Sequence, residues 1–179
     1  MPHHIHISYS DTDRESLDTL AKYLDTFAPV FGYTFWSRAN LESGELKQQQ
    51  IQHSVSNADA IIFLVTIDLY AEKDEVELDF ELAMGHVDAG RALAVPILLR
   101  SMPAFDRLPL SKYPLPTGVG PMDLEPNPAQ AWKIVVEWIF QVFEKLGQRE
   151  VYRSFLEEDR SRFIDLANEV NILWEKRLG

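Results

Sequence analysis

The feature that most constrains the fold is a run of six apolar residues at positions 60–65, Ala-Ile-Ile-Phe-Leu-Val, with no polar residue among them. A strand with one solvated face alternates apolar and polar residues, so this run predicts a strand that is buried on both faces. Such strands belong to parallel sheets with helices packed on either side. The sequence therefore predicts an α/β fold built on a covered parallel sheet.

Further short apolar runs fit the same architecture. They predict strands at residues 5–9, 33–36 and 93–99. Pro96 lacks a donor for the sheet ladder, so it predicts a strand end, an edge strand or a bulge. Seven of the ten prolines fall between residues 101 and 128 and predict irregular chain, with a short fifth strand at about Val119–Met122.

Helical patterns separate these runs. Apolar residues at helical spacing predict helices at residues 17–27, from about 45 to 57, and at 76–89. Gly32 and Gly90 are placed to end the first and the last of these helices. This alternation of strands and helices is typical of a parallel sheet with helical crossovers.

Two more helical patterns occupy the C-terminal part. The first covers residues 129–146, and Gly147 is expected to end it. The second covers about residues 150–177 and is strongly amphipathic, so its apolar side must pack on this domain or on a partner protein. We therefore expect a domain at residues 4–147 and a C-terminal amphipathic helix at 148–179.

Composition excludes several classes of function. The chain has no cysteine, which rules out disulfides, thiolate chemistry and cysteine-ligated metal sites. Its formal charge of −11 argues against nucleic-acid binding, which needs a basic face. No apolar run approaches the length of a membrane span, and the N-terminus is too short and polar for a signal peptide. We expect a cytoplasmic protein without membrane or nucleic-acid partners.

Three histidines lie near the N-terminus, at positions 3, 4 and 6. In a strand, His4 and His6 would share one face and the neighbouring isoleucines the other. Metal binding by these histidines is the minor interpretation, and histidines on the surface of a strand are the ordinary one. His53 and His86 are isolated and are expected at the surface or an interface. We expect no metal site.

The segment that follows the first run, Ile7-Ser8-Tyr9-Ser10 with Asp11 and Asp13 before a helix, resembles the first strand and loop of Toll/interleukin-1 receptor homology (TIR) domains. The stretch from Trp36-Ser37-Arg38 to Gly44-Glu45 is similar to the BB loop of that family, which links the second strand to its helix. Asn57-Ala58-Asp59 is similar to the residues that lead into the third strand of the family.

Beyond the third strand, the chain from Thr66 to Ala83 and on to Arg100 follows the bacterial branch of the family without a gap. The resemblance covers about residues 4–146. It implies a flavodoxin-like layer of five parallel strands with helices on both faces, in agreement with the strand pattern. Many members cleave NAD between nicotinamide and ribose, often in antiphage or cell-death defence, and others act only through TIR–TIR contacts.

NAD cleavage passes through an oxocarbenium-like state, which a carboxylate beside the ribose stabilises. The resemblance places the catalytic glutamate of the family at Asp79, which keeps the charge but is one methylene shorter. Glu77 and Glu81 lie about 200° round the helix and substitute only after a shift of one register. The alternative is that Asp79 is one more charge on a solvated helix face.

Other residues are candidates for binding the substrate, by their place at strand ends or near the BB loop. They are Tyr9, Ser10, Trp36, Arg38, Lys47 and Thr66. Parallel sheets bind ligands outside the carboxyl ends of their strands, which favours Tyr9 and Ser10. The tryptophan offers a stacking surface, and the two cations offer charge for a pyrophosphate. Ordinary packing, core and surface roles remain the alternatives.

Two functional hypotheses follow. The first is a TIR-domain enzyme that hydrolyses or cyclises NAD on self-assembly, with NAD as substrate and no cofactor. The second is a non-catalytic adaptor or scaffold that binds TIR partners through the BB loop and another protein through the C-terminal helix. Residues 66–90 carry eight acids and one lysine. This charge would repel a pyrophosphate, so Arg38, Lys47 or helix N-termini, of this chain or of a neighbouring subunit, are expected to offset it, which predicts assembly.

Overall fold

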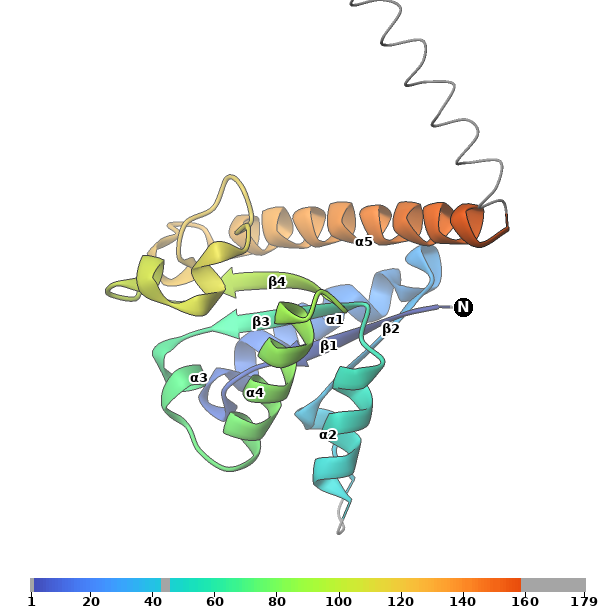
Figure 1. Ribbon diagram of the computed structural model, residues 1–179. Helices are drawn as coiled ribbons and strands as arrows, with labels where there is room; N and C mark the ends of the chain where they lie inside the picture. Colours follow the sequence, from blue (N-terminus) through green and yellow to red (C-terminus); the bar gives the residue numbers. More distant parts are fainter. Residues whose placement is uncertain (1, 43–45, 159–179) are drawn as a thin grey trace, which may run out of the picture. The chain divides into compact units, whose positions relative to one another are not determined.

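The structure is a computed structural model that describes residues 2–42 and 46–158. The chain forms two compact units, Met1–Gln141 and Val142–Gly179, and each is considered by itself. The first unit contains the sheet and its covering helices (Figure 1). The second contains the continuation of the last helix.

All four strands of the sheet run parallel, in the order β2-β1-β3-β4 (Figure 1). Their bounds are His3–Ser8 for β1, Tyr33–Ser37 for β2, Ala60–Val65 for β3 and Leu93–Leu98 for β4. Every residue of β3 is buried, which confirms that this strand is covered on both faces. The four strands predicted from the apolar runs are therefore confirmed: the bounds of β3 are those predicted, and those of the other three differ by one or two residues.

Helices cover both faces of the sheet. On one face, α2 (Lys47–Ser56) and α4 (Glu75–Asp88) pack on β3 through a cluster that includes Ile51, Phe63 and Val87. The short α3 (Ile67–Ala71) lies before α4. On the other face, α1 (Arg14–Phe31) contacts the first part of α5, where the Phe140 ring lies 4.5 Å from that of Phe31. Because the strands are parallel, their carboxyl ends lie together at one end of the sheet, where functional side chains can meet.

Two local predictions about backbone chemistry are confirmed. Gly32 ends α1 in the left-handed conformation, with φ of 63°, and its N–H donates to the Ala28 carbonyl. Pro96 lies within β4 opposite Phe63, and β4 is an edge strand of the four. A proline is tolerated there because an edge strand has one side whose N–H groups pair with no neighbouring strand.

The fifth strand predicted at about Val119–Met122 is wrong for the residues that the structure describes, whose sheet has four strands. Pro121 has no N–H to donate, and the chain turns into a 3-10 segment at Met122–Leu124. Contact with β4 is limited to its end, where Asp123 N–H donates to the Leu99 carbonyl at 3.0 Å. Asp123 also accepts from the Ser101 N–H through its side chain, so local bonds replace a ladder.

The helix stop predicted at Gly147 is also wrong. Helix α5 runs without a break over Pro128–Glu158, and Gly147 is not among the glycines with positive φ. A glycine within a helix costs only about 1 kcal/mol, so helical residues on either side outweigh it. The second predicted helix, at about residues 150–177, falls largely outside the described residues, and the domain division at 147/148 stays a prediction. None of the described helices is apolar over enough of its length to cross a bilayer.

Candidate functional site

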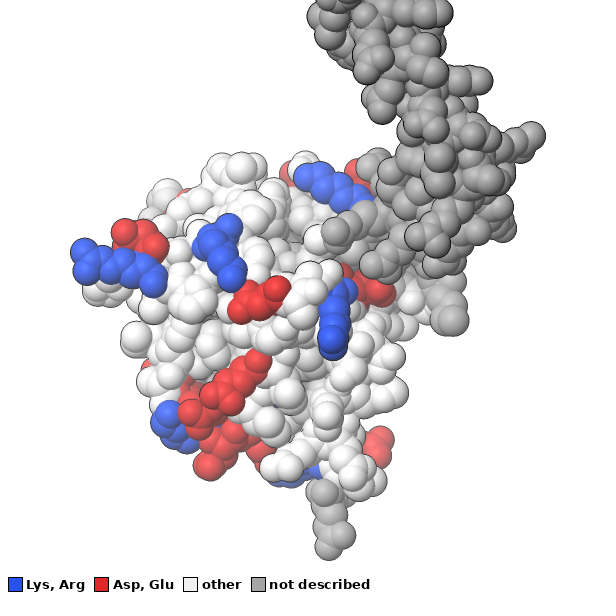
Figure 2. Space-filling view, in the orientation of Figure 1, with Lys and Arg blue, Asp and Glu red and all other residues white. Residues whose placement is uncertain are grey.

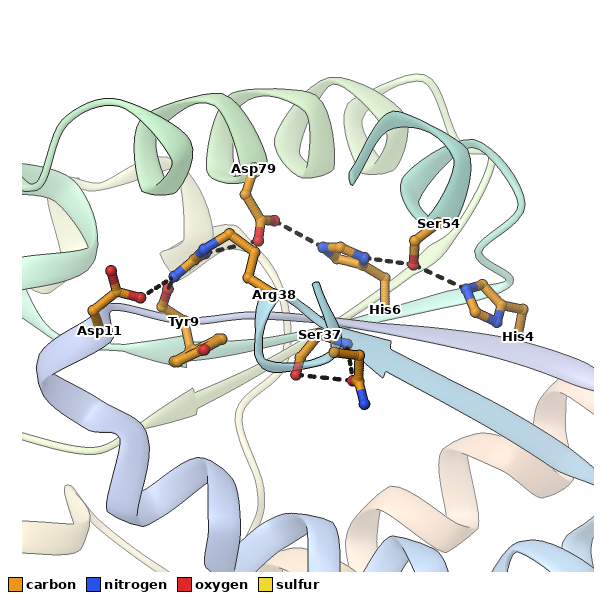
Figure 3. A network of polar contacts seen from close by, with 9 residues as sticks. His4, His6, Tyr9, Asp11, Ser37, Arg38, Ser54 and Asp79 are labelled. Atoms are coloured by element: carbon orange, nitrogen blue, oxygen red, sulfur yellow. Dashed lines mark hydrogen bonds and ion pairs between the residues drawn. The ribbon is translucent and has the colours of Figure 1, made fainter. Parts of the chain in front are cut away.

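The candidate site lies on the face of β1 that α2 and α4 cover. His6 points from β1 into this layer, and its Nε2 lies 2.7 Å from Oδ1 of Asp79 on α4 (Figure 3). On its other side, Nδ1 of His6 lies 2.9 Å from Oγ of Ser54 on α2. Both His6 and Asp79 have no exposed surface. Strand alternation explains this placement, because it puts the apolar Ile5 and Ile7 on the opposite face.

Arg38 binds the second carboxylate oxygen of Asp79. Its NH1 donates to Oδ2 of Asp79 at 2.8 Å, and its NH2 donates to the Tyr9 carbonyl at 2.6 Å and to Asp11 Oδ1 at 2.9 Å (Figure 3). The guanidinium also lies 4.5 Å from the centre of the Tyr9 ring. Arg38 begins the 3-10 segment Arg38–Asn40 immediately after β2, so its side chain ties this connection to the end of β1.

Arg38 and Asp79 form an ion pair that is shielded from solvent. The side chains of Arg38 and Asp79 are 3% and 0% exposed. Burial alone would lower the pKa of Arg38, but the carboxylates of Asp79 and Asp11 raise it overall. Burial raises the pKa of the Tyr9 hydroxyl, against the lowering effect of the Arg38 charge. The negative charge of Asp79 is thus balanced by Arg38, and both carboxylate oxygens are hydrogen-bonded within the protein.

A second polar cluster lies where β1, β3 and β4 end. Thr66 donates to Asp13 Oδ2 at 2.6 Å, and Arg100 donates to Asp13 Oδ1 at 2.8 Å. The Ser10 hydroxyl donates to Glu72, and Ser10 also caps the 3-10 turn that follows by accepting from Thr12 N–H. Burial is the main reason that the pKa of Asp13 is raised. Ser10 and Thr66 therefore belong to this cluster, beside the Arg38 contacts.

The remaining candidates are spread over the surface. Lys47 pairs with Glu75, 3.0 Å away, and Glu77 pairs with Lys73 at 2.9 Å, all four side chains being at least 42% exposed. Glu81 is also exposed. Figure 2 shows acidic side chains gathered over the connection into α4 and over α4 itself, as the acid count of residues 66–90 predicts. None of these exposed residues contacts the Arg38–Asp79 pair in the contacts described above.

Several expectations about single residues change. Asp79 does not lie on a solvated helix face, because α4 turns it into the core. His6 is not a surface histidine, and His4 is only partly exposed. Trp36 stacks on the His6 ring, with centroids 5.7 Å apart, so the ring that was expected to stack on a substrate stacks on a residue of the protein. Among the described residues, no group of three or more potential ligands is arranged to hold a metal ion.

Sequence reasoning missed the contacts between these residues. It treated His6 and Asp79 separately, although they are 73 positions apart in the chain and joined by a hydrogen bond. It also missed Ser54, which links His4 and His6. The one local signal for this cluster was His6 between two isoleucines of a strand, since a buried polar group needs a partner; Asp79 and Ser54 stand in polar helices and gave no such signal.

Comparisons with known proteins identify the family to which this fold belongs. A Sinorhizobium fredii protein named y4lF is 27% identical over 97 residues, which cover 54% of this chain and 30% of that protein. The crystal structure of the TIR domain of the Toll-related receptor TRR-2 from Hydra magnipapillata superposes with a TM-score of 0.52 at 15% identity. That match covers 78% of this chain and 97% of the Hydra domain, and shows a shared fold. The family model for TIR domains matches residues 5–136, well over half of the chain, which therefore belongs to the TIR domain family.

Proposed function

We propose that the chain is a TIR interaction module in which Asp79 is part of the internal framework. The observation that carries this proposal is the state of the carboxylate: Asp79 has no exposed surface, and each of its oxygens accepts a hydrogen bond from another side chain of the protein. A carboxylate that stabilises an oxocarbenium ion must lie against the sugar ring. Asp79 meets this requirement only if Arg38 and the segment behind it move away.

The contact surface of such a module includes the connection between β2 and α2. Arg38 fixes the start of this connection, and Ser37 N–H donates to Asn40 Oδ1 at 3.1 Å. Leu46, at the entrance to α2, is 54% exposed although it is a large apolar residue. An exposed leucine beside an anchored loop is suited to contact with a second TIR domain, because it loses its exposed apolar surface there. TIR–TIR self-association is the partner relationship that the family membership supports.

The second candidate function is cleavage of NAD, by hydrolysis or cyclisation, in an open form of the same domain that assembles during bacterial defence. It is favoured by the place of Asp79, whose ion pair with Arg38 reaches the Tyr9 carbonyl just beyond the end of β1. Ligands of parallel sheets bind at that edge. In this function Arg38 would leave Asp79 and be free for the pyrophosphate.

One set of assays separates the two functions. Purified protein is incubated with NAD at low and high protein concentration, nicotinamide release is followed, and molecular mass in solution is measured in parallel. The interaction module predicts concentration-dependent association that Leu46→Lys weakens, with no nicotinamide release. The matched control is Ile67→Lys, because Ile67 is 59% exposed but begins α3, after β3, and is not part of the β2–α2 connection.

Enzymatic variants decide the remaining case. Release that is abolished by Asp79→Asn and retained by Glu81→Gln and Glu77→Gln would replace the first function by the second. Release that depends on Glu81 instead would show that the helix presents its exposed face to the substrate. A folded, monomeric wild type at every concentration, without TIR partners, would remove the interaction module.

A further inference from the structure

The two edges of the sheet differ in their ability to pair with a further strand. The strand order leaves β2 and β4 each with one outer side (Figure 1). In β4, Leu93 N–H donates to the Asp59 carbonyl, so every second N–H from Leu93 on points to β3 and position 96 faces outward. Pro96 has no N–H to offer there, and a proline is one of the devices that prevent pairing at an exposed edge. The outer edge of β4 is therefore interrupted.

The outer edge of β2 lacks this protection. His3 N–H donates to the Gly32 carbonyl, so even-numbered residues of β2 face β1 and Phe35 turns its N–H and C=O outward. In the part of the chain that the structure describes, neither of these two groups is bonded to another residue. The next outward donor, Ser37 N–H, is held by Asn40 Oδ1 at 3.1 Å. Since β2 contains neither proline nor lysine, its edge remains open to a further strand at Phe35.

A groove of about 430 Å³ lies between this edge and α1. Helix α1 lines it with one stripe of residues at helical spacing, which are Arg14, Asp18, Ala21, Asp25 and Ala28. On the strand side the lining includes Phe35, which is only partly buried. Alternation along β2 puts the Phe35 ring on the same face as Tyr33, whose hydroxyl donates to the Leu24 carbonyl of α1. The open edge is thus bordered by a hollow with charges on its helical side.

The Tyr33 contact fixes which part of α1 lies beside Phe35. Because α1 connects two neighbouring parallel strands, it runs antiparallel to β2, and the Tyr33 hydroxyl marks the level of Leu24. Phe35 lies two residues further along β2, which is about 7 Å and corresponds to about four residues of helix. The level of Phe35 on α1 is therefore at about residue 20. Arg14 and Asp25 lie on opposite sides of this level, each about 8 Å from it.

These two side chains carry opposite charges at the two ends of the groove. Asp25 is exposed, and in the described part of the chain it takes part in no ion pair. It lies close to Tyr33, since its charge adds to the main effect of burial in raising the pKa of that phenol to about 12. Arg14 pairs with Asp18 one turn along the helix, but both side chains are more than half exposed. Such surface pairs are weak, so Arg14 is available to another carboxylate.

We propose that two copies of this chain pair through the outer edges of β2, antiparallel and related by a two-fold axis at Phe35. The two Phe35 residues then exchange both of their N–H···O=C bonds, and their rings lie side by side on the α1 face. The two-fold axis exchanges the ends of the groove, so Arg14 of each copy meets Asp25 of the other. The surface is complementary to itself, as an isologous interface requires, and it closes as a dimer.

This pairing goes beyond the contact proposed for the β2–α2 connection. It uses the edge of the sheet and one stripe of α1, whereas the connection presents Leu46 at the entrance to α2. Each of the two surfaces can be occupied or empty independently of the other. Variants at Leu46 and at the charges of α1 therefore report on them separately.

Hydrogen exchange of the full chain tests the strand pairing directly. The Phe35 amide has no acceptor in a single chain, whereas the amide of Trp36 faces β1 and is bonded within the sheet. When about 90% of the chains are dimeric, exchange at Phe35 should slow about tenfold relative to the monomer, because only the monomer exposes this amide. The Trp36 amide should be protected at low and at high protein concentration. A dimer in which Phe35 still exchanges as in the monomer overturns the proposal.

Charge reversal tests the antiparallel arrangement. Arg14→Glu and Asp25→Lys each place like charges at both contacts of the dimer, and each should raise the Kd in sedimentation equilibrium about tenfold. An equimolar mixture of the two variants should associate as tightly as the wild type. In the mixed dimer one contact joins the two substituted residues and the other joins the two native ones, so both contacts pair opposite charges.

Matched controls come from the same helix. Lys22→Glu and Glu15→Lys make the same changes of charge at exposed positions of α1 that do not line the groove. Both should keep the wild-type Kd. All four substitutions replace exposed side chains, and circular dichroism verifies that each variant is folded.

Each outcome supports the pairing or overturns it. A wild type that stays monomeric at every concentration overturns it, and so do reversals whose Kd equals that of the controls. A mixture that remains as weak as the single variants excludes the two-fold arrangement. Dimerisation that Leu46→Lys abolishes and both reversals leave intact would assign the contact to the β2–α2 connection and overturn the edge pairing. Dimerisation that survives Leu46→Lys and is restored in the mixture supports the edge pairing, even where the connection binds nothing.

Discussion

Removing Arg38 while Asp79 remains should strongly destabilise the fold. The substitution Arg38→Met keeps much of the side-chain volume but leaves a carboxylate with no exposed surface and one remaining donor, His6. Breaking a buried ion pair in this way costs about 3–5 kcal/mol of unfolding free energy. For a chain of this size that corresponds to a fall of about 6–20 °C in melting temperature.

A double-mutant cycle isolates the interaction itself. Asp79→Leu leaves a buried guanidinium and should cost a similar amount, whereas the double variant removes both charges at once. We expect the double variant to be more stable than the sum of the single effects predicts, by about 2–3 kcal/mol. Unfolding in guanidinium chloride, followed by circular dichroism, measures all four proteins. Lys47→Met is the matched control, because the exposed Lys47–Glu75 pair should contribute less than about 1 kcal/mol.

The sign of the Asp79 effect also separates a structural carboxylate from a catalytic one. A residue retained for catalysis is commonly neutral or costly to stability, so its removal leaves the protein as stable or more stable. A loss below about 1 kcal/mol for either single variant, or additivity within about 0.5 kcal/mol, would refute the view of the pair as framework. It would then restore Asp79 as a residue kept in place for chemistry.

Three further outcomes are expected. Burial is the main reason that the pKa of His4 is lowered from 6.5, so the unfolded chain binds more protons than the folded one below that pH. The free energy of unfolding should therefore fall as the pH drops from about 6.5 to the folded pKa. Urea titrations of His4→Gln should show a flatter pH dependence in this range. Thr66→Val removes the hydroxyl that donates to the buried Asp13 and should cost about 1–3 kcal/mol in the same assay, a loss below 0.5 kcal/mol being contrary to this reasoning. Burial raises the pKa of Tyr33 and Tyr70 to about 12, so absorbance at tyrosinate wavelengths should show two phenols that ionise well after the exposed ones.

The strands and most helices were predictable because their signals are local. An uninterrupted apolar run, an apolar stripe or a glycine at a helix end depends on neighbours within one or two turns. The predictions of a fifth strand and of a helix stop at Gly147 were wrong because each rested on a local signal that the surrounding structure outweighs. A weak local signal at Val119–Met122 is overruled by the bonds of Asp123, and a glycine signal at Gly147 is overruled by the helix on both sides.

The candidate site was predictable only as a set of residues, not as an arrangement. The resemblance selected Arg38 and Asp79, but it assigned the first to a phosphate and the second to a ribose. Their mutual contact spans 41 positions, and that of His6 with Asp79 spans 73. Such contacts depend on strand order and on how α4 is rotated about its axis, neither of which a single sequence states. A buried aspartate requires partners, but the burial of Asp79 is not visible in the sequence, because this residue stands in a run of acids with Glu75, Glu77 and Glu81.

The concentrated acidity of residues 66–90 has a different meaning in the folded protein. Five of its eight acids form ion pairs with cations, four of which come from other segments of the chain: Asp68 with Arg100, Glu75 with Lys47, Glu77 with Lys73, Asp79 with Arg38 and Asp88 with Lys112. The field that would repel a pyrophosphate is therefore much weaker than the count along the sequence suggests. The two cations expected to bind that pyrophosphate are the same ones that neutralise the acids. Acidity thus gives no reason for assembly, and the case for association rests on family membership and on the exposed apolar residue beside the β2–α2 connection.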